Sequence, residues 1–235
     1  MERMINYNGV ELESVAPVMV EDIKVSPIEM TATARQLPIR WGAEYVRMTG
    51  GSRTVEISFG LLVDKPEIRT AHIMAITKWA RANEPKRLLL PYYSGKYLEA
   101  ICTALPAPSM RQWWENKLRL TFTTFDNPYW TDTSEKSVAC GTAFTVLGDA
   151  PPLMRIERTL TASASDQAYS DGTNTMTFTT IPAGDLVIDL DKQTAAVNGA
   201  SIMQYYTFDS SFIRAEPGTN TITGTGTVYW RERWE

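Results

Sequence analysis

Alternation of hydrophobic and polar residues, the pattern of a strand with one buried face, recurs along most of this chain. Residues 55–63 alternate and then become continuously apolar, as in a strand that grows more covered along its length. Leu118, Leu120 and Phe122 alternate with polar residues, and residues 97–103 are a third strand candidate. Strands of this kind bury one face and leave the other wet, so the pattern predicts a β-sandwich or an open barrel.

One helix is expected between the first of these strands and the next. Asp64 is a suitable N-cap, and Pro66 suits the first turn, where its missing N–H would have no partner. The segment Asn83-Glu84-Pro85 ends the helical pattern. The expected apolar stripe consists of Ile68, Ala71, His72, Ala75, Ile76 and Trp79. The N-terminal half is therefore predicted to be a β domain with one helix packed over a sheet face.

The second half of the chain carries only the β pattern. Leu186, Ile188 and Leu190 alternate with more polar neighbours, and Asn198-Gly199 is a strong signal for a two-residue hairpin. Short strands separated by turns every ~8–12 residues predict a β-sandwich. The polar stretch from Thr131 to Lys136 is the best boundary, and we predict two domains, residues 1–134 and 135–235.

Composition narrows the class of protein. A hydrophobic fraction of 43% and a charged fraction of 21% are typical of a folded globular protein, and a net charge of −4 does not favour nucleic-acid binding. Cys102 and Cys140 are too few to cross-link a secreted scaffold and are expected as reduced, packed thiols. The sequence shows no signal peptide and no apolar run near the ~18 residues that span a bilayer. The chain is expected to fold in a cytosol.

Residues with catalytic potential are sparse. The single histidine, His72, falls on the apolar stripe of the helix and is expected to be partly buried. No zinc-site spacing, phosphate-binding loop or nucleophile elbow is present. Asp185, Asp189 and Asp191 share the solvent side of a strand, where carboxyls keep ordinary pKa values and make poor general acids. We predict no catalytic residues, no metal and no cofactor.

Two groups of residues remain as candidates for binding. Arginines flank a glycine-bearing stretch that reads as a long loop or extended hairpin, and arginine is well suited to interfacial ion pairs. A solvated basic loop is the alternative interpretation. Aromatic residues of the C-terminal domain offer a weaker site for sugar rings, although Trp230 shares a strand face with Val228 and is expected in the core. The ring-interface candidates are Arg35, Arg40, Arg47 and Arg53, and the sugar-contact candidates are Tyr205, Tyr206, Trp230 and Trp234.

The order of these features resembles the siphophage distal tail proteins. In the N-terminal half, the resemblance rests on the arginine-flanked stretch, the strand to Val63, the helix to Trp79, Lys86-Arg87-Leu88-Leu89-Leu90, residues 94–100 and Asp126-Asn127-Pro128-Tyr129-Trp130. In the C-terminal half it rests on Gly141-Thr142, Gly148-Asp149-Ala150-Pro151-Pro152, Leu186-Val187-Ile188-Asp189, Val197-Asn198-Gly199 and residues 216–222.

This resemblance implies a belt domain, sandwich-like or split-barrel-like with one helix, followed by a galectin-like jelly roll. It implies a homo-hexameric ring in the virion tail tip, assembled in the host bacterial cytoplasm. The ring would join the tail tube protein to a tail-tip or tail-lysin hub protein and, in some relatives, to a receptor-binding protein. DNA would pass through its channel without sequence-specific contacts, and no membrane is involved. We expect the ring seam at residues 31–53. A carbohydrate-binding module of the phage adhesion device and a cell-wall glycosidase are the alternatives.

Overall fold

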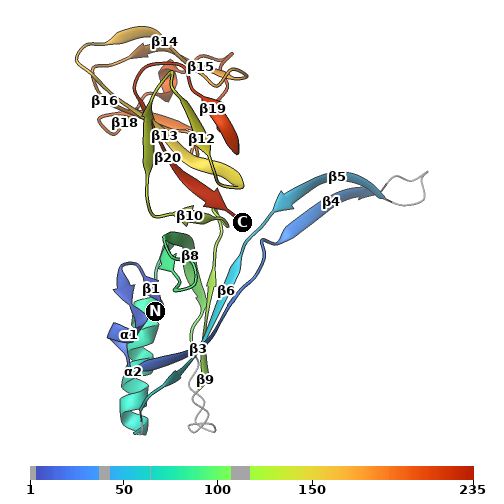
Figure 1. Cartoon of the computed structure of the whole chain (residues 1–235), viewed down its shortest axis with the longest axis vertical. Coiled ribbons are helices and arrows are strands. Elements are labelled where there is room, and N and C mark those ends of the chain that lie inside the picture. The colour runs from blue at the N-terminus through green and yellow to red at the C-terminus, as the bar shows by residue number, and fades with distance from the viewer. Residues whose placement is uncertain (1–3, 37–42, 64, 107–116) are drawn as a thin grey trace. The chain divides into compact units, whose positions relative to one another are not determined.

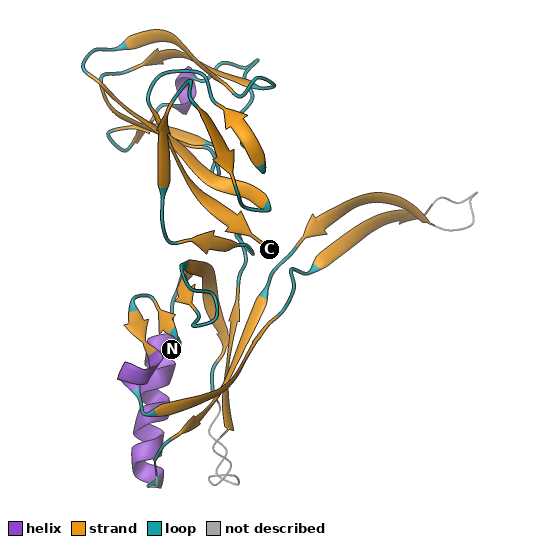
Figure 2. Cartoon of the chain, viewed as in Figure 1, coloured by secondary structure: helices purple, strands orange, loops and turns teal. Residues whose placement is uncertain are grey.

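The computed structural model describes residues 4–36, 43–63, 65–106 and 117–235 of the chain (Figure 1). The chain divides into two compact units: an N-terminal unit of residues 1–130, with which Glu235 is grouped, and a C-terminal unit of residues 131–234. The sequence placed the boundary after Ser134, and the structure divides the chain after Trp130. Both units consist mainly of antiparallel strands (Figure 2), which confirms the expected mainly β class.

One antiparallel sheet forms the body of the N-terminal unit. Hydrophobic residues face each other across its strands, because Val55 pairs with Phe122 and Phe59 pairs with Leu118. All four of these side chains are buried, so they form one continuous apolar face. The strands lie in the order β3 (Val18–Val25), β6 (Thr54–Leu61), β9 (Lys117–Thr123), β8 (Lys96–Ala104), β7 (Lys86–Leu89), β1 (Asn6–Tyr7) and β2 (Val10–Glu11).

Helix α2 (Pro66–Ala80) packs on that apolar face, and the short helix α1 (Leu12–Val15) lies beside it. The Trp79 ring stands edge-on to Tyr7 and to Phe122, at centroid distances of 5.7 and 6.2 Å. The indole Nε1 of Trp79 donates a hydrogen bond to the carbonyl oxygen of Val10 at 3.0 Å. The C-terminal end of α2 is thereby fixed to the sheet.

The buried face of α2 differs from the stripe expected from the sequence. Ile73, Ile76 and Ala80 are buried, whereas Ile68 and Ala71 are exposed. The helix has apolar residues on more than one side, so spacing alone did not fix which side meets the sheet. Pro66 is the first helical residue as expected, His72 and Trp79 are partly buried, and Asp64 lies outside the described residues.

A two-stranded ribbon, which we call the arm, extends from the N-terminal unit (Figure 1). It consists of β4 (Met30–Gln36) and β5 (Ala43–Gly50), which pair from Met30 opposite Gly50 to Gln36 opposite Ala43. In the described part of the chain these two strands pair only with each other. The arm continues the ribbon formed by β3 and β6, through a hydrogen bond from the Glu29 amide to the Ser52 carbonyl oxygen at 3.0 Å.

The C-terminal unit encloses one hydrophobic core between a larger sheet and two strand pairs. Ile156, Ile188 and Val228 from the sheet meet Phe144 and Phe178 from the strand pairs. The sheet order is β18 (Ala200–Ser201), β17 (Thr194–Val197), β16 (Gly184–Asp189), β13 (Ala150–Leu160), β20 (Thr227–Trp234) and β11 (Lys136–Ala139). The pairs are β12 (Ala143–Val146) with β19 (Gly218–Thr221), and β14 (Ala164–Ser170) with β15 (Thr175–Ile181). Strand β10 (Trp130–Asp132) crosses the division between the units, and a 3-10 helix, η2 (Met203–Tyr205), follows β18.

Candidate functional site

The candidate arginines of the arm differ in position from Arg53, which follows the arm in the chain. Arg35 is exposed on β4, and Arg47 lies on β5, opposite Thr33 in the strand register. Arg40 lies outside the described residues. These three positions belong to the arm or to the segment that joins its strands, so the candidate ring interface in this part of the chain is the arm itself.

Arg53 is a structural residue, which corrects its place among the interface candidates. Its side chain is only 4% exposed, and its guanidinium carbon lies 6.0 Å from the ring centroid of Trp130. The amide of Arg53 donates to the hydroxyl of Thr124, and the amide of Thr124 donates to the carbonyl oxygen of Arg53, both at 2.9 Å. Arg53 therefore joins the start of β6 to the end of β9 inside the N-terminal unit. The sequence could not show this, because the chain turns back into the unit immediately after Gly50 and Gly51.

The arm has the properties of an element that needs a partner. Every side chain from Met30 to Arg35 is exposed, and Met30 alone leaves 58% of its surface uncovered. An isolated two-stranded ribbon is at best marginally stable in water, and each of its outer edges presents unpaired backbone groups. When such a ribbon adds to a sheet of another chain, the ribbon is stabilised and the backbone groups of its edge become paired.

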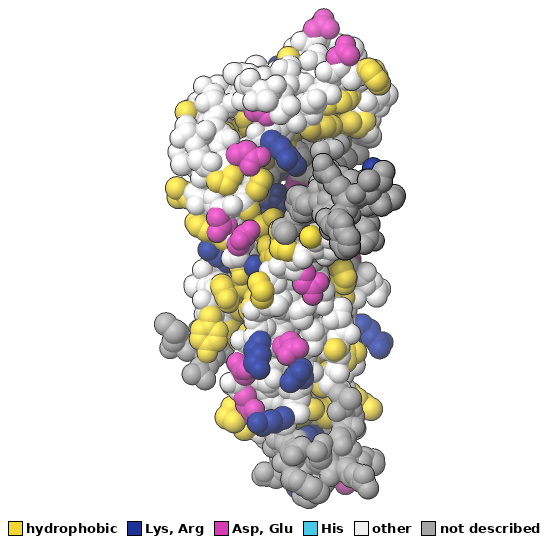
Figure 3. All heavy atoms as spheres, turned by 90° about the vertical axis from the view of Figure 1, so that its right-hand side faces the viewer, with side chains coloured by type: hydrophobic (Ala, Val, Ile, Leu, Met, Phe, Trp, Pro, Cys, Tyr) yellow, Lys and Arg dark blue, Asp and Glu magenta, His cyan; other side chains and the backbone are white. Residues whose placement is uncertain are grey.

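The face of the N-terminal sheet away from α2 carries charges of both signs. Lys24 pairs across the strands with Glu56, whose carboxylate lies 3.4 Å from the guanidinium of Arg119. The ammonium of Lys117 lies 3.7 Å from the carboxylate of Glu21. Lys, Arg, Asp and Glu side chains gather together on the lower part of the face drawn in Figure 3. Exposed pairs of this kind contribute little to stability, so this face is better suited to orienting a contact than to holding the fold.

The aromatic candidates of the C-terminal unit lie in different surroundings. Trp230 is in the core as expected, only 6% exposed, with its ring centroid 4.7 Å from that of Phe144. Tyr205 and Tyr206 are partly buried against the core, and Tyr206 stacks on Phe212 at 5.1 Å. Trp234 donates from Nε1 to the carboxylate of Asp132 at 3.0 Å. The contacts of these four residues do not form one shared aromatic platform.

The three clustered aspartates each serve a local structural contact. Asp185 accepts a hydrogen bond from the hydroxyl of Thr159 at 2.7 Å. Asp189 accepts from the backbone amide of Lys192 at 3.0 Å, and Asp191 pairs with Arg233 at 2.8 Å. Three carboxylates with three separate partners do not form the opposed pair that glycoside hydrolysis needs.

The buried carboxylate of Glu232, which no sequence pattern indicated, connects several parts of the C-terminal unit. Glu232 is 1% exposed and accepts hydrogen bonds from the ammonium of Lys136 at 2.7 Å and from Nε1 of Trp230 at 3.1 Å. Its second oxygen accepts from the amides of Leu147 and Gly148, at 2.9 and 3.0 Å. Burial alone would raise the pKa of Glu232, but the hydrogen bonds and the Lys136 charge outweigh it and lower that pKa below its usual value.

The segment between the units is anchored to the C-terminal unit. The two terminal guanidinium nitrogens of Arg155, Nη1 and Nη2, donate to the carboxylate of Glu135, and Arg231 lies 3.4 Å from the same carboxylate. Arg231 also donates to the carbonyl oxygens of Asp132 and Thr133. The hydrogen bond from Arg155 is the largest influence that lowers the pKa of Glu135. These contacts explain why the division lies before Thr131 although the polar residues that follow look like a linker.

Cys102 and Cys140 are free, partly buried thiols, and burial raises the pKa of Cys102 to about 11. Among the described residues, no group of three or more His, Cys, Asp and Glu side chains is arranged to hold a metal ion. Neither helix in the described ranges combines the length and the hydropathy that a membrane crossing requires.

Comparison with known proteins connects these features to phage tails. Residues 147–234 match the family model of the siphovirus-type tail component, C-terminal domain. The crystal structure of the Dit protein (gp 19.1) of phage SPP1, described as a paradigm of the hub adsorption apparatus in phages that infect Gram-positive hosts, is similar over 100% of both chains. Its TM-score is 0.79 and its sequence identity is 14%. No curated protein sequence matches the chain.

Chains of the phage p2 baseplate in its activated conformation also align with this chain. The alignment with a chain of the strontium-bound baseplate covers 98% of this chain and 98% of the baseplate chain, with a TM-score of 0.47. The alignment with a chain of the calcium-bound baseplate covers 99% of this chain and 98% of the baseplate chain, with a TM-score of 0.46. The sequence identity is 7% in both cases.

Residues 147–234 are thus similar to the C-terminal domain of siphovirus-type tail components, and the whole chain shares the fold of a phage tail hub protein. More particularly, its fold resembles that of a siphophage distal tail protein, the Dit protein of phage SPP1. The expected resemblance is confirmed, by sequence over the C-terminal domain and by fold over the whole chain.

Proposed function

We propose that this protein is a non-enzymatic structural subunit that closes into a homo-hexameric ring at the end of the tail tube. The arm carries this proposal, because residues 30–35 of β4 are exposed and β4 and β5 pair only with each other among the described residues. A closed ring forms when one patch on each subunit fits a different patch on its neighbour. An arm that pairs with the sheet of the next subunit supplies such a contact.

Charge gives this contact a direction. The arm carries Arg35 and Arg47, while Glu21 and Asp22 lie exposed on β3 at the edge of the N-terminal sheet. Arginine is favoured in contacts between subunits, because its planar guanidinium binds a carboxylate through two hydrogen bonds. We propose that residues 31–50, with Arg40 included, form the ring seam.

The number six and the partners follow the resemblance to distal tail proteins. One face of the ring would bind the tail tube protein and the other a tail-tip or tail-lysin hub protein. The C-terminal units would offer attachment to a receptor-binding protein. DNA would cross the ring through its channel without sequence-specific contacts, and assembly would take place in the host bacterial cytoplasm.

Light scattering coupled to size exclusion tests the ring. We expect a particle of about six times the 26.4 kDa chain mass. Replacing Arg35 and Arg47 with glutamate should leave folded single chains with unchanged circular dichroism, because both positions lie on the arm. The matched control replaces Lys192 and Arg214 of the C-terminal unit with glutamate, which changes the net charge equally and should leave the ring intact. Single chains from the unaltered protein at tens of micromolar, or intact rings from the arm variant, would refute the proposal.

A further inference from the structure

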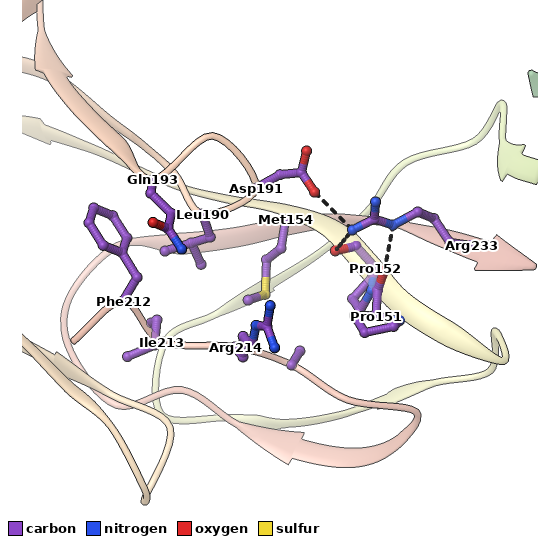
Figure 4. A pocket seen from close by; sticks show the side chains of 11 residues that line it. Pro151, Pro152, Met154, Leu190, Asp191, Gln193, Phe212, Ile213, Arg214 and Arg233 are labelled. Atoms are coloured by element: carbon purple, nitrogen blue, oxygen red, sulfur yellow. Dashed lines mark hydrogen bonds and ion pairs between the residues drawn. The ribbon is translucent and has the colours of Figure 1, made fainter. Parts of the chain in front are cut away.

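A small pocket opens on the C-terminal unit, and its lining contains none of the residues expected to bind sugar (Figure 4). It lies between the start of β13, the turn that follows β16, the segment before β19 and the end of β20. Its volume is about 100 Å³. The residues that line it are Pro151, Pro152, Met154, Leu190, Asp191, Gln193, Phe212, Ile213, Arg214, Ala215 and Arg233.

The floor of the pocket is apolar and rigid. Met154, Leu190 and Ile213 are all buried members of the hydrophobic core, so their positions are fixed by packing. Phe212 forms a wall, and its ring is held by the stack on Tyr206 at an interplanar angle of 22°. The base of the pocket is therefore a small apolar surface of fixed shape.

Polar groups of defined position surround this floor. One oxygen of Asp191 is held by Arg233 at 2.8 Å, and Arg233 is itself bound to the carbonyl oxygen of Pro151. The second oxygen of Asp191 makes no hydrogen bond with any residue that the structure describes. Gln193 points its side-chain amide toward the floor beside Leu190 (Figure 4). A carboxylate and a side-chain amide therefore both belong to the lining of this small space.

Arg214 adds a positive charge. Its backbone amide donates to the carboxylate of Asp171 at 2.8 Å, which fixes the start of the side chain. Its guanidinium is exposed and forms no ion pair within the described ranges. Arg214 is thus anchored at its main chain and open at its charged end, the arrangement in which arginine binds a carboxylate or a phosphate through two hydrogen bonds.

We propose that this pocket binds one anionic pyranose unit, a sugar ring that carries a carboxylate or a phosphate. The C–H face of the ring would lie on Met154 and Leu190, its hydroxyls would bond to Asp191 and Gln193, and its acidic group would pair with Arg214. The pocket is far smaller than the ~300–1,000 Å³ typical of sites that enclose drug-sized ligands, so it suits a single ring held at one face. The proposal does not depend on whether the chain forms rings.

Saturation-transfer NMR on the full-length protein tests this with three glucose derivatives, one neutral and two with an acidic group at C6. Methyl glucoside is neutral, glucuronic acid carries a carboxylate, and glucose 6-phosphate carries a phosphate. We expect the acidic sugars to bind about fivefold more tightly than the glucoside, the scale of one exposed ion pair. The stronger of the two acidic probes identifies the acidic group.

Two variants assign the effect to Arg214. Arg214→Gln should remove the preference for acidic sugars while leaving the weak binding of methyl glucoside. The control Lys192→Gln changes a neighbouring exposed lysine that does not line the pocket, and it should keep the full preference. The proposal is overturned if all three sugars bind equally, if Arg214→Gln retains the preference, or if inorganic phosphate displaces the acidic sugars at the same concentration as glucose 6-phosphate.

Discussion

Replacing Glu232 with glutamine tests the claim that one buried carboxylate holds the C-terminal unit together. Glutamine has nearly the same shape, but its NH₂ group replaces one of the two acceptor oxygens. In the native unit one oxygen of Glu232 faces Lys136 and Trp230, and the other faces the amides of Leu147 and Gly148. The variant therefore turns a donor toward other donors whichever way its amide is oriented.

The expected loss of stability follows from these contacts. Hydrogen bonds to a charged group contribute about 1.5–3 kcal/mol each, and a buried donor left without an acceptor costs about 1–3 kcal/mol. The side chain of Lys136 is 37% exposed, so solvent screens its share of the interaction. We expect Glu232→Gln to lower the free energy of unfolding by about 3 kcal/mol, equivalent to a fall of about 10–20 °C in Tm for a unit of this size.

Thermal and urea unfolding, followed by near-UV circular dichroism, measure this change. The control Glu216→Gln alters an exposed carboxyl group of the same unit and should change stability by less than about 0.5 kcal/mol. A double-mutant cycle with Lys136→Met separates the ion pair from the amide contacts. If Glu232→Gln unfolds within about 0.5 kcal/mol of the unaltered protein, the carboxylate does not hold this unit together.

The pKa of Glu232 is lowered in the folded protein, so its contribution to stability is complete above the ordinary glutamate pKa and is lost as pH falls through the folded pKa. In unfolding measured as a function of pH, acid should therefore destabilise the unaltered protein more steeply than the Glu232→Gln variant. Gly148→Ala should cost about 2 kcal/mol or more in urea unfolding, because the added Cβ would lie 2.2 Å from the carbonyl oxygen of Arg233, and a loss below about 0.5 kcal/mol would contradict that packing. Arg53→Glu should lower the Tm of the N-terminal unit, because it buries a carboxylate in place of a guanidinium that lies near Trp130. The control Arg35→Glu should leave that Tm unchanged. Equal Tm values in the two variants would place Arg53 at the surface.

Elements defined by local pattern were predictable from the sequence. The alternation at residues 55–63 and 118–123 corresponds to β6 and β9, and the alternation from Leu186 corresponds to β16. Asn198 and Gly199 both adopt positive φ, at 50° and 81°, as the two-residue hairpin requires. These features depend on interactions between near neighbours in the chain, so they can be predicted from the sequence alone.

Features that depend on distant contacts were not predictable. Arg35 and Arg53 looked equivalent in the sequence, yet one is exposed on the arm and the other is buried beneath Trp130. Glu232 resembled any charged residue near a terminus, and its four donors come from residues 84 to 96 positions away and from its own strand. The pocket around Arg214 combines segments that approach each other only after the sandwich has formed.

The sequence by itself determined the β class, the single long helix and the order of features that resembles distal tail proteins. These follow from hydrophobic periodicity and turn residues, which act over a few positions of the chain. Only the tertiary structure decided which charged side chains are buried, which face of α2 meets the sheet and that the arm stands without a partner strand in its own described chain. The reason is that burial and pairing depend on what the rest of the folded chain brings to each position.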